Sequence, residues 1–274
     1  MFVRVPGSSA NLGPGFDALG MALDLTADVG LINGSVPADA RAADAHHPAD
    51  VAFRRMGGTG DIWVRSRLPM GRGLGYSGAV RVGGLVLAAA QRSEDCDLPM
   101  DEVLRHASEL EGHADNVAAS LHGGVVVAAG ARVVRVPVAF DASVVVWIPS
   151  FTTSTDASRG RLPETVSLAD AAFNVARSSL LVAALVAGDV ESLREATLDR
   201  LHQPHRLSAS PQSAAAVTAA LDAGAWAAWL SGSGPSVAAL CAPAQAAAIA
   251  GSLPADGQAK VLAIAAQGAT VHGR

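Results

Sequence analysis

The chain has 274 residues, of which 50% are hydrophobic and 16% are charged, and its formal net charge is −5. This length suits about two domains with separate cores, and the composition excludes general disorder. Because no basic block is present, no nucleic-acid surface is expected. We find no apolar run long enough to span a membrane and no signal peptide, so the sequence predicts a cytoplasmic protein. Cys96 and Cys241 show no metal-ligand spacing and are predicted to be reduced thiols.

The first segment alternates like a β-strand over residues 2–5 and then becomes rich in glycine and polar residues. Residues 6–17 read PGSSANLGPGFD, which contains too many turn formers for a regular element. Asn11 and Asp17 are short polar groups that can bind an amino or hydroxyl group of a ligand. An Asx-rich turn without any ligand would explain the same residues.

The next part of the chain is predicted to contain two strands and a short helix. The strands cover residues 19–32 and 61–65, and the helix covers residues 52–56. Residues 34–50 are rich in proline, alanine and aspartate, which is typical of a surface connection. His46 and His47 within it are expected to be solvated.

The most informative stretch runs from Pro69 to Ala79, reads PMGRGLGYSGA, and leads into a predicted helix over residues 80–92. Its glycines alternate just before a helix N-terminus, where free N–H groups and the helix dipole attract anions. We therefore predict that this loop cradles the phosphates of a nucleoside triphosphate.

Three other interpretations fit parts of this loop. The string from Gly73 to Gly78 spells the dinucleotide fingerprint GxGxxG, with Glu94 near the position of its ribose-binding acid. However, the strand before it alternates in polarity and is separated from the glycines by a loop. A Walker loop needs a lysine after its last glycine, and the only lysine is Lys260. The third interpretation is a glycine-rich turn without a ligand.

A predicted helix over residues 100–111 ends in the acidic string ELE, although acids at a helix C-terminus oppose the dipole. This conflict indicates a separate role for Glu111. A carboxylate that faces a nucleotide loop is a natural magnesium ligand. Residues 112–116, GHADN, then open a short helix at residue 117, and an Asp/Asn cap on this helix would explain part of that string.

The second half of the chain changes in character after a hairpin over residues 125–138 and a strand over residues 143–148. Helices are predicted at residues 168–187, 190–202, 210–223 and 245–253, and strands at residues 226–230, 236–241 and 260–264. Strands that return after helices in this order indicate a second α+β domain, with a boundary near residues 138–143.

Three features of this half could bind a ligand. Arg159 and Arg161 precede a Leu-Pro pair, where a forked cation could grip a carboxylate or a phosphate. Residues 202–206 read HQPHR and bring Arg206 beside two histidines, but the proline between them argues against a helical metal-binding pair. The loop SGSGPS at residues 231–236 is either a hairpin or a second wall of the nucleotide site.

Together these segments resemble the GHMP small-molecule kinase superfamily, and within it the homoserine kinases, over nearly the whole chain. Residues 6–17, 69–79 and 230–235 resemble the three motifs of the superfamily. The strings ELEGHADNV at residues 109–117, Leu-Pro at 162–163 with Arg159 ahead of it, and DRLHQPHR at 199–206 resemble homoserine kinases. The resemblance implies an α+β fold with an ATP-binding domain like ribosomal protein S5 over residues 1–140. It also implies a ferredoxin-like domain over residues 141–274, with the ligands in the cleft between the two.

The resemblance further implies phosphoryl transfer from MgATP to the side-chain hydroxyl of L-homoserine, which gives O-phospho-L-homoserine for threonine biosynthesis. The implied phosphate cradle consists of Pro69, Gly71, Arg72, Gly73, Leu74, Gly75, Tyr76, Ser77 and Gly78. Ser77 and Glu111 would hold the magnesium ion. The residues implied around the amino and hydroxyl end of homoserine are Asn11, Asp17, His113 and Asn116, and Gly232 is a further implied substrate-binding residue. Arg159 and Arg206 would grip its carboxylate, as suits a bidentate fork on a planar anion.

The implied catalytic residues are Glu111, Asp115 and Asn116, and the mechanism stays open between two alternatives. In other GHMP kinases, an Asp at the position of Asp115 is proposed as the base. For homoserine kinases, direct attack without a base is also argued. Phosphoryl transfer depends mostly on positioning and charge neutralisation, so the sequence permits both.

The chain departs from the family pattern in two places. Tyr76 replaces the first serine of the usual Gly-Leu-Gly-Ser-Ser loop, and its ring could point outward, alter nucleotide choice or abolish turnover. The stretch between Asp17 and Pro69 is shorter than expected, in a region that usually helps to form the base pocket. Two alternatives follow, namely a GHMP kinase for another small hydroxylated metabolite and a catalytically silent GHMP-fold binding protein. Dimers are common in the family, so a homodimer is a further expectation.

Overall fold

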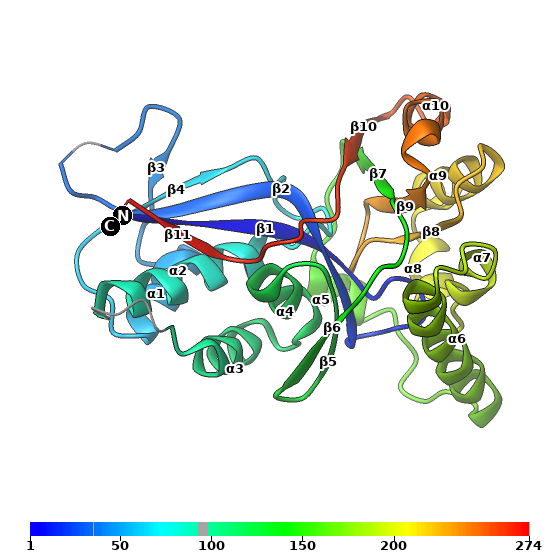
Figure 1. The fold of residues 1–274 in the computed structure, drawn as a ribbon, viewed down its shortest axis with the longest axis horizontal. Helices are drawn as coiled ribbons and strands as arrows, with labels where there is room; N and C mark the ends of the chain where they lie inside the picture. The colour runs from blue at the N-terminus through cyan, green and yellow to red at the C-terminus, as the bar shows by residue number, and fades with distance from the viewer. Residues whose placement is uncertain (35, 93–97, 274) are drawn as a thin grey trace.

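Two antiparallel sheets form the framework of the chain. The computed structural model describes residues 1–34, 36–92 and 98–273. Its first sheet has the strand order β11-β1-β2-β4-β3, with the hairpin β5-β6 attached to β2, and its second has the order β10-β7-β9-β8. The sheets lie toward opposite ends of the molecule, each with helices beside it (Figure 1). This mixed helix and sheet content confirms the predicted α+β class.

The elements fall into two sets. The first sheet consists of β1 (Phe2–Ala10), β2 (Leu19–Leu31), β3 (Arg41–Ala42), β4 (Ile62–Ser66), β5 (Val125–Ala129), β6 (Arg132–Val136) and β11 (Thr270–His272). Its helices are α1 (Pro48–Arg55), α2 (Tyr76–Arg92), α3 (Met100–Glu111) and α4 (Asp115–His122). The second sheet consists of β7 (Ser143–Pro149), β8 (Ala227–Leu230), β9 (Val237–Cys241) and β10 (Gly257–Leu262). Its helices are α5 (Thr155–Arg159), α6 (Leu168–Ala187), α7 (Leu193–Ala196), α8 (Gln203–Leu207), α9 (Pro211–Asp222), α10 (Ala246–Ser252) and the 3-10 turn η1 (Pro243–Gln245).

Helix α2 is the central helix of the first half, and most of its residues are buried. Two glycines in its middle allow neighbouring elements to approach closely. A Cβ atom at Gly83 would lie 2.6 Å from Val29 of β2, and one at Gly84 would lie 2.2 Å from the carbonyl oxygen of Ala49 in α1. This packing fixes the N-terminal end of α2, which carries the glycine loop.

The predicted helices over residues 100–111 and 168–187 match α3 and α6. Two other predictions were wrong. Residues 6–10 continue β1 as strand, because the chain keeps pairing with β2 across a register shift between Pro6 and Gly7. Residues 190–202 do not form one helix, since only Leu193–Ala196 is helical. Asp199 accepts hydrogen bonds from three following backbone N–H groups, which competes with a continuous helix.

The last strand, β11, was not predicted, and it pairs with β1 of the first sheet. The predicted boundary near residue 140 lies between the end of β6 and the start of β7 and stays a prediction. Cys241 is buried in β9 as a free thiol, as expected. Glu94 and Cys96 lie outside the described residues.

Helix α6 corrects the expectation that no apolar run reaches the length of a membrane span. It has 20 residues, with a mean hydropathy of 1.4 over an 18-residue window, and suffices by length and composition, although one such helix is weak evidence by itself. Polar contacts attach α6 to the rest of the protein. The Asn174 amide donates to the carbonyl of Pro14 and to Asp199, and Arg177 forms an ion pair with Glu195.

Candidate active site

A cleft lined by both halves of the chain contains the predicted site. Every site residue implied by the family resemblance lines it except Gly78, whereas Arg161, the other arginine candidate, does not. Gly78 is buried in α2, where a Cβ atom would touch Val117 of α4. The cleft volume of about 190 Å³ is below the several hundred cubic ångströms that suit a drug-sized ligand. Its enclosed part therefore suits a small metabolite and a few phosphate groups. Ala10, Thr153, Ser154 and Ser233 also line the cleft. Ala10 and Ser233 lie within the first and third motifs, whereas no motif in the sequence had marked Thr153 and Ser154.

The backbone conformation and close contacts of the loop before α2 explain its alternating glycines. Gly71, Gly73 and Gly75 all have positive φ angles, of 66°, 70° and 70°. A Cβ atom at Gly73 would lie 2.2 Å from the Ser231 carbonyl oxygen, and one at Gly75 would lie 2.1 Å from the hydroxyl of Ser8. Only glycine satisfies both conditions, so the loop is held between β1 and the loop after β8. It runs directly into Tyr76, the first residue of α2, where backbone N–H groups are free to bind an anion.

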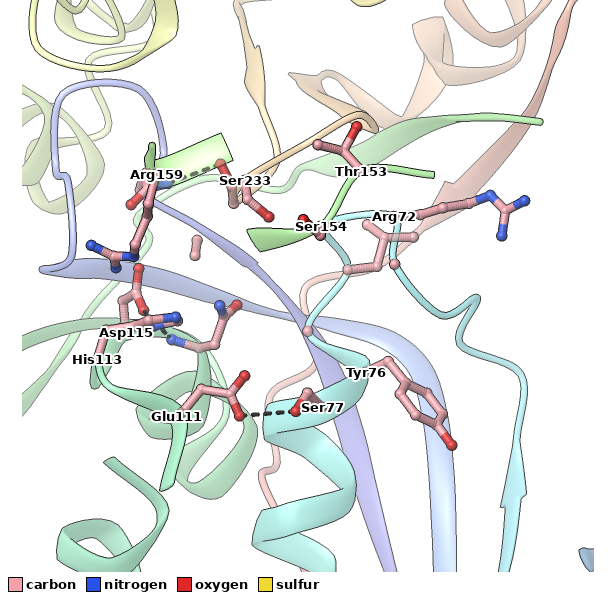
Figure 2. Close-up of a pocket in the computed structure, with 18 of the residues that line it drawn as sticks. Arg72, Tyr76, Ser77, Glu111, His113, Asp115, Thr153, Ser154, Arg159 and Ser233 are labelled. Atoms are coloured by element: carbon pink, nitrogen blue, oxygen red, sulfur yellow. Dashed lines mark hydrogen bonds and ion pairs between the residues drawn. The ribbon is translucent and has the colours of Figure 1, made fainter. Parts of the chain in front are cut away.

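Arg72 lines the cleft without directing its charged group to the phosphate cradle. Its Nε atom donates to the Pro149 carbonyl at 2.9 Å, and its Nη2 atom donates to the Ser150 carbonyl at 2.8 Å. Figure 2 shows the guanidinium group pointing away from Ser77 and Glu111. Arg72 therefore anchors the loop to the end of β7.

Tyr76 points out of the phosphate cradle. Its hydroxyl lies 3.1 Å from Nε2 of His47, and Figure 2 shows its ring directed away from Glu111. His47 is half-buried rather than solvated, which corrects the sequence expectation, and its Nδ1 atom accepts from Ala49 N at the start of α1. Burial raises the pKa of Tyr76 and lowers that of His47. The tyrosine thus adds its bulk beside α1 and leaves the phosphate cradle open.

Ser77 and Glu111 meet at the edge of the cleft, as the magnesium prediction required. The Ser77 hydroxyl donates to Oε2 of Glu111 at 3.1 Å (Figure 2). Arg81, one helical turn after Ser77, also donates to this Oε2 at 2.7 Å and to the Leu110 carbonyl. The sequence analysis missed Arg81, although its i+4 spacing from Ser77 places both residues on one face of α2.

This pair of residues fits a magnesium ion. Magnesium prefers oxygen ligands and is usually held by one or two carboxylates together with phosphate oxygens and water. The hydroxyl of Ser77 and the carboxylate of Glu111 supply such oxygens. Oε1 of Glu111 has no hydrogen-bond partner among the residues that the structure describes. Arg81 balances the charge of the carboxylate through its other oxygen.

A polar wall follows at the N-terminus of α4. Nδ1 of His113 lies 2.6 Å from Oδ1 of Asp115, and both side chains are largely buried. Burial alone would lower the pKa of His113, but the carboxylates of Asp115, Asp17 and Glu111 outweigh burial and raise it. Asn116 accepts from the Ser8 hydroxyl through its amide oxygen, which leaves its amide N–H₂ group available to a ligand.

The loop between β1 and β2 is shaped by residues with left-handed backbone. Asn11, Leu12 and Asp17 have φ angles of 70°, 47° and 56°, and such strain is common at functional sites. Asn11 holds this conformation, because its amide oxygen accepts from Asp17 N and its amide nitrogen donates to the Gly232 carbonyl. The predicted ligand residue Asn11 therefore shapes the site and is nearly fully buried.

Asp17 and Arg159 form an ion pair across the cleft, with 2.6 Å between Oδ1 and Nη2. Both side chains remain partly exposed, so either can contact a ligand. The ligand atoms of Asp17, His113 and Asp115 lie within 4.8 Å of one another and could also hold a metal ion. Arg159 already contacts Asp17, and His113 already contacts Asp115. The two carboxylates could instead accept hydrogen bonds from the ammonium group of a ligand.

Arg206 is the most unusual residue of the cleft, since only 5% of it is exposed. Its Nη1 atom donates to the Gly232 carbonyl at 3.1 Å and to Nδ1 of His202 at 3.2 Å. Among the described residues, no carboxylate pairs with it, and its buried Nε atom has no partner. Burial, followed by the charge of Arg159, lowers the pKa of Arg206. A buried cation without a counter-ion is costly, so this position calls for an anionic ligand.

The chain matches known proteins over both halves. Residues 41–124 match the family model of the GHMP kinases N terminal domain, and residues 181–259 match that of the GHMP kinases C terminal. The homoserine kinase of Moorella thermoacetica is 40% identical over 258 residues, which span 87% of this chain and 86% of that protein. The homoserine kinase of Thermus thermophilus is 39% identical over 278 residues, which span 95% and 94%.

Solved structures agree with these matches. The crystal structure of homoserine kinase from Cytophaga hutchinsonii superposes with a TM-score of 0.86 at 26% identity, covering 98% of this chain and 96% of that one. The predicted two-domain GHMP kinase architecture is thereby confirmed.

Proposed function

The chain belongs to the homoserine kinase family of GHMP kinases, and from this premise we propose that it phosphorylates L-homoserine. ATP, which kinases of this family use, supplies the phosphoryl group, and the side-chain hydroxyl of homoserine accepts it. The product is O-phospho-L-homoserine, an intermediate for threonine biosynthesis.

The observation that carries this proposal is the buried Arg206, which lines the cleft without a bonded carboxylate among the described residues. A substrate that reaches from the loop to Arg206 needs a hydroxyl near the loop and an anionic group at its other end. Homoserine has both, because its carboxylate can pair with the free edge of the guanidinium group. Removing the carboxylate from the substrate would leave the buried charge of Arg206 uncompensated.

The ion pair between Asp17 and Arg159 suits the amino acid as a whole. Its ammonium group can replace Arg159 as the partner of Asp17, and its carboxylate can replace Asp17 as a partner of Arg159. A zwitterion thus exchanges one ion pair for two without adding net charge to the cleft. This exchange selects an α-amino acid over a simple alcohol.

At the opposite end, the peptide N–H groups of the loop from Gly71 to Ser77 receive the phosphates of ATP. Ser77 and Glu111 would hold Mg²⁺, which neutralises charge on the phosphates when it is bound. Arg81 keeps the Glu111 carboxylate turned toward Ser77. Asn116 donates its amide N–H₂ group to the homoserine hydroxyl and orients it for in-line attack.

Two routes for the hydroxyl proton remain within this proposal. In the first, Asp115 and His113 act as a coupled pair, and the pair takes up the proton as the bond to phosphorus forms. In the second, the hydroxyl attacks directly and Asp115 only orients His113. In both routes Asp115 is the residue that fixes the imidazole.

The proposal extends to the surroundings of the protein. We propose a cytoplasmic enzyme with a small-molecule substrate, without nucleic-acid or membrane partners, that forms a homodimer. The polar contacts of Asn174 and Arg177 on α6 support the absence of a membrane partner, because a lipid-facing helix would not be attached through them.

The test is an assay of ATP consumption by the purified protein with L-homoserine and Mg²⁺, with the product identified by ³¹P NMR. We expect turnover that depends on homoserine and little turnover with 3-aminopropan-1-ol, which lacks the carboxylate. L-Serine, which is one methylene shorter, is the matched amino-acid control. Turnover with a different alcohol and none with homoserine would contradict the proposal.

A further inference from the structure

The aromatic ring of Phe16 lies against both arginines of the cleft. The Cζ atoms of Arg159 and Arg206 each lie 5.4 Å from the centre of this ring. The imidazole of His202 stacks on the same ring with 5.2 Å between ring centres. Phe16 does not itself line the cleft, so any effect that it has on a ligand must pass through these neighbours.

The two guanidinium groups repel one another, and the charge of Arg159 contributes to the lowered pKa of Arg206. An aromatic ring carries a negative face that attracts cations. This attraction is stronger where water is excluded than at exposed sites. A single ring in contact with both groups therefore offsets part of their repulsion and sets the spacing between them.

His202 supports Arg206 through a defined tautomer. The guanidinium group of Arg206 can only donate, so Nδ1 of His202 must be the acceptor of the bond between them. The carbonyl of Gly13 can only accept, so Nε2 of His202 carries the proton and donates at 2.7 Å. Burial lowers the pKa of His202, which favours this neutral form.

These contacts leave Nη2 of the Arg206 guanidinium group for a ligand. Nη1 is used by Gly232 and His202, and Nε is buried without a hydrogen-bond partner among the described residues. Nη2 makes no hydrogen bond to any described residue, so it is the atom that can donate to a carboxylate.

We propose that Phe16 is a positioning residue for the substrate carboxylate, which it serves by holding the guanidinium groups of Arg159 and Arg206 apart, with His202 as a second support. This inference rests on the proposed function, because homoserine supplies the carboxylate. It assigns a role to the phenylalanine of the string PGFD, which the motif interpretation of residues 6–17 had left without one.

The test compares Phe16→Leu and Phe16→Tyr with the wild-type protein. Leucine keeps an apolar side chain and removes the ring, whereas tyrosine keeps the ring. We expect Phe16→Leu to raise the KM for homoserine about tenfold, with kcat and the KM for ATP within about twofold of wild type. Phe16→Tyr should restore the KM for homoserine. His202→Gln, which keeps a donor for Gly13 and removes the acceptor for Arg206, should raise the same KM.

Phe173→Leu is the matched control, because Phe173 also contacts two guanidinium groups, those of Arg177 and Arg200, but lies outside the cleft lining. Its KM for homoserine should equal that of wild type. An unchanged KM in Phe16→Leu, or equal losses in all three kinetic constants, would overturn the inference. Failure of Phe16→Tyr to restore the KM would overturn it as well.

Calorimetry separates this inference from the proposed function. If the wild-type protein does not phosphorylate homoserine, the proposed function fails. Titration of homoserine into the protein still measures how tightly the arginines that Phe16 positions bind its carboxylate. In that case, weaker binding of homoserine to Phe16→Leu than to wild type would support the positioning role of Phe16. If homoserine does not bind the wild-type protein, the inference fails together with the function. If thermal unfolding shows that Phe16→Leu does not fold, the test rests on His202→Gln. An unchanged KM for homoserine in that variant would then overturn the inference.

Discussion

The two ends of the cleft present different chemical groups to a ligand. At the phosphate-loop end, the proposed binding groups are peptide N–H groups of consecutive residues ahead of α2, and Arg81 and Glu111 neutralise one another there. At the arginine end, the proposed binding groups are side chains from distant segments. Asp17 and Arg159 are 142 residues apart, and Asn11 and Gly232 are 221 residues apart. Figure 2 shows Arg159 and Ser77 on opposite sides of the cleft.

This difference separates the binding of the phosphates from the selection of the acceptor substrate. Peptide dipoles bind any polyphosphate and leave no buried net charge when it departs. The buried charge of Arg206, in contrast, remains uncompensated until an anion arrives. On the proposed function, the phosphate end would govern the rate of transfer, and the arginine end would govern which acceptor is used. A change at one end should therefore leave the function of the other end intact.

The largest effect is expected from Glu111→Gln at the phosphate end. The change removes the carboxylate charge proposed to hold Mg²⁺, so kcat should fall by about 100-fold or more, while the KM for homoserine changes little. Steady-state kinetics at several Mg²⁺ concentrations will measure this. Glu109→Gln is the control, since this exposed carboxylate on the same helix pairs with Arg55 and Arg105 instead. A kcat for Glu111→Gln equal to that of the control would remove Glu111 from the site.

At the arginine end, Arg206→Ala should give the opposite kinetic pattern. Removing one partner of a buried charged pair costs about 2 kcal/mol or more, which corresponds to a KM for homoserine raised about 30-fold. The KM for ATP should stay near its wild-type value. Arg200→Ala, which removes an exposed arginine outside the cleft, should change neither constant. If Arg206→Ala left the KM for homoserine unchanged, Arg206 would be structural.

The sequence indicates the phosphate end more clearly than the arginine end. The physical reason is that neighbouring residues determine the loop conformation at the phosphate end. The positive φ angles at Gly71, Gly73 and Gly75 are dictated within a few residues, so a spacing of glycines reveals the loop. The contacts of Arg206 with His202 and Gly232 depend on tertiary packing. The residues themselves marked Arg159 and Arg206 as possible ligand-binding groups, but only the resemblance of motifs assigned the substrate carboxylate to them.

Errors in the predicted fold have the same cause. Residues 6–10 look like turn formers, yet sheet pairing with β2 makes them strand. Arg81 looks like one polar residue on the face of a helix, and only its contact with Glu111 gives it a role. Elements whose pattern is repeated over many residues, such as α3 and α6, were predicted with correct bounds because local periodicity decides them.

A smaller effect is expected between the two ends, where Asp115 meets His113. Asp115→Asn removes the largest attraction for the imidazolium, so the pKa of His113 should fall from its raised value. A group with a raised folded pKa stabilises the protein fully below its ordinary pKa of 6.5 and loses that contribution as pH rises through the folded value. Wild type should therefore lose more stability than Asp115→Asn as pH rises through that range. NMR titration of His113 and urea unfolding across pH will measure both effects, and equal pH dependence in the two proteins would contradict this account.

The smallest effect is expected at Tyr76, although it occupies the phosphate loop. Because its hydroxyl contacts His47 outside the cradle, Tyr76→Phe should leave kcat and the KM for ATP within about twofold of wild type. The lost hydrogen bond is worth about 1 kcal/mol of unfolding free energy, which thermal unfolding will detect. In a double-mutant cycle, combining Tyr76→Phe with His47→Asn, which keeps an acceptor for Ala49 N and removes Nε2, should cost little more than either change alone. A tenfold loss of kcat in Tyr76→Phe would instead show that the hydroxyl acts in the cleft, and the phosphate end would then depend on a side chain as the arginine end does.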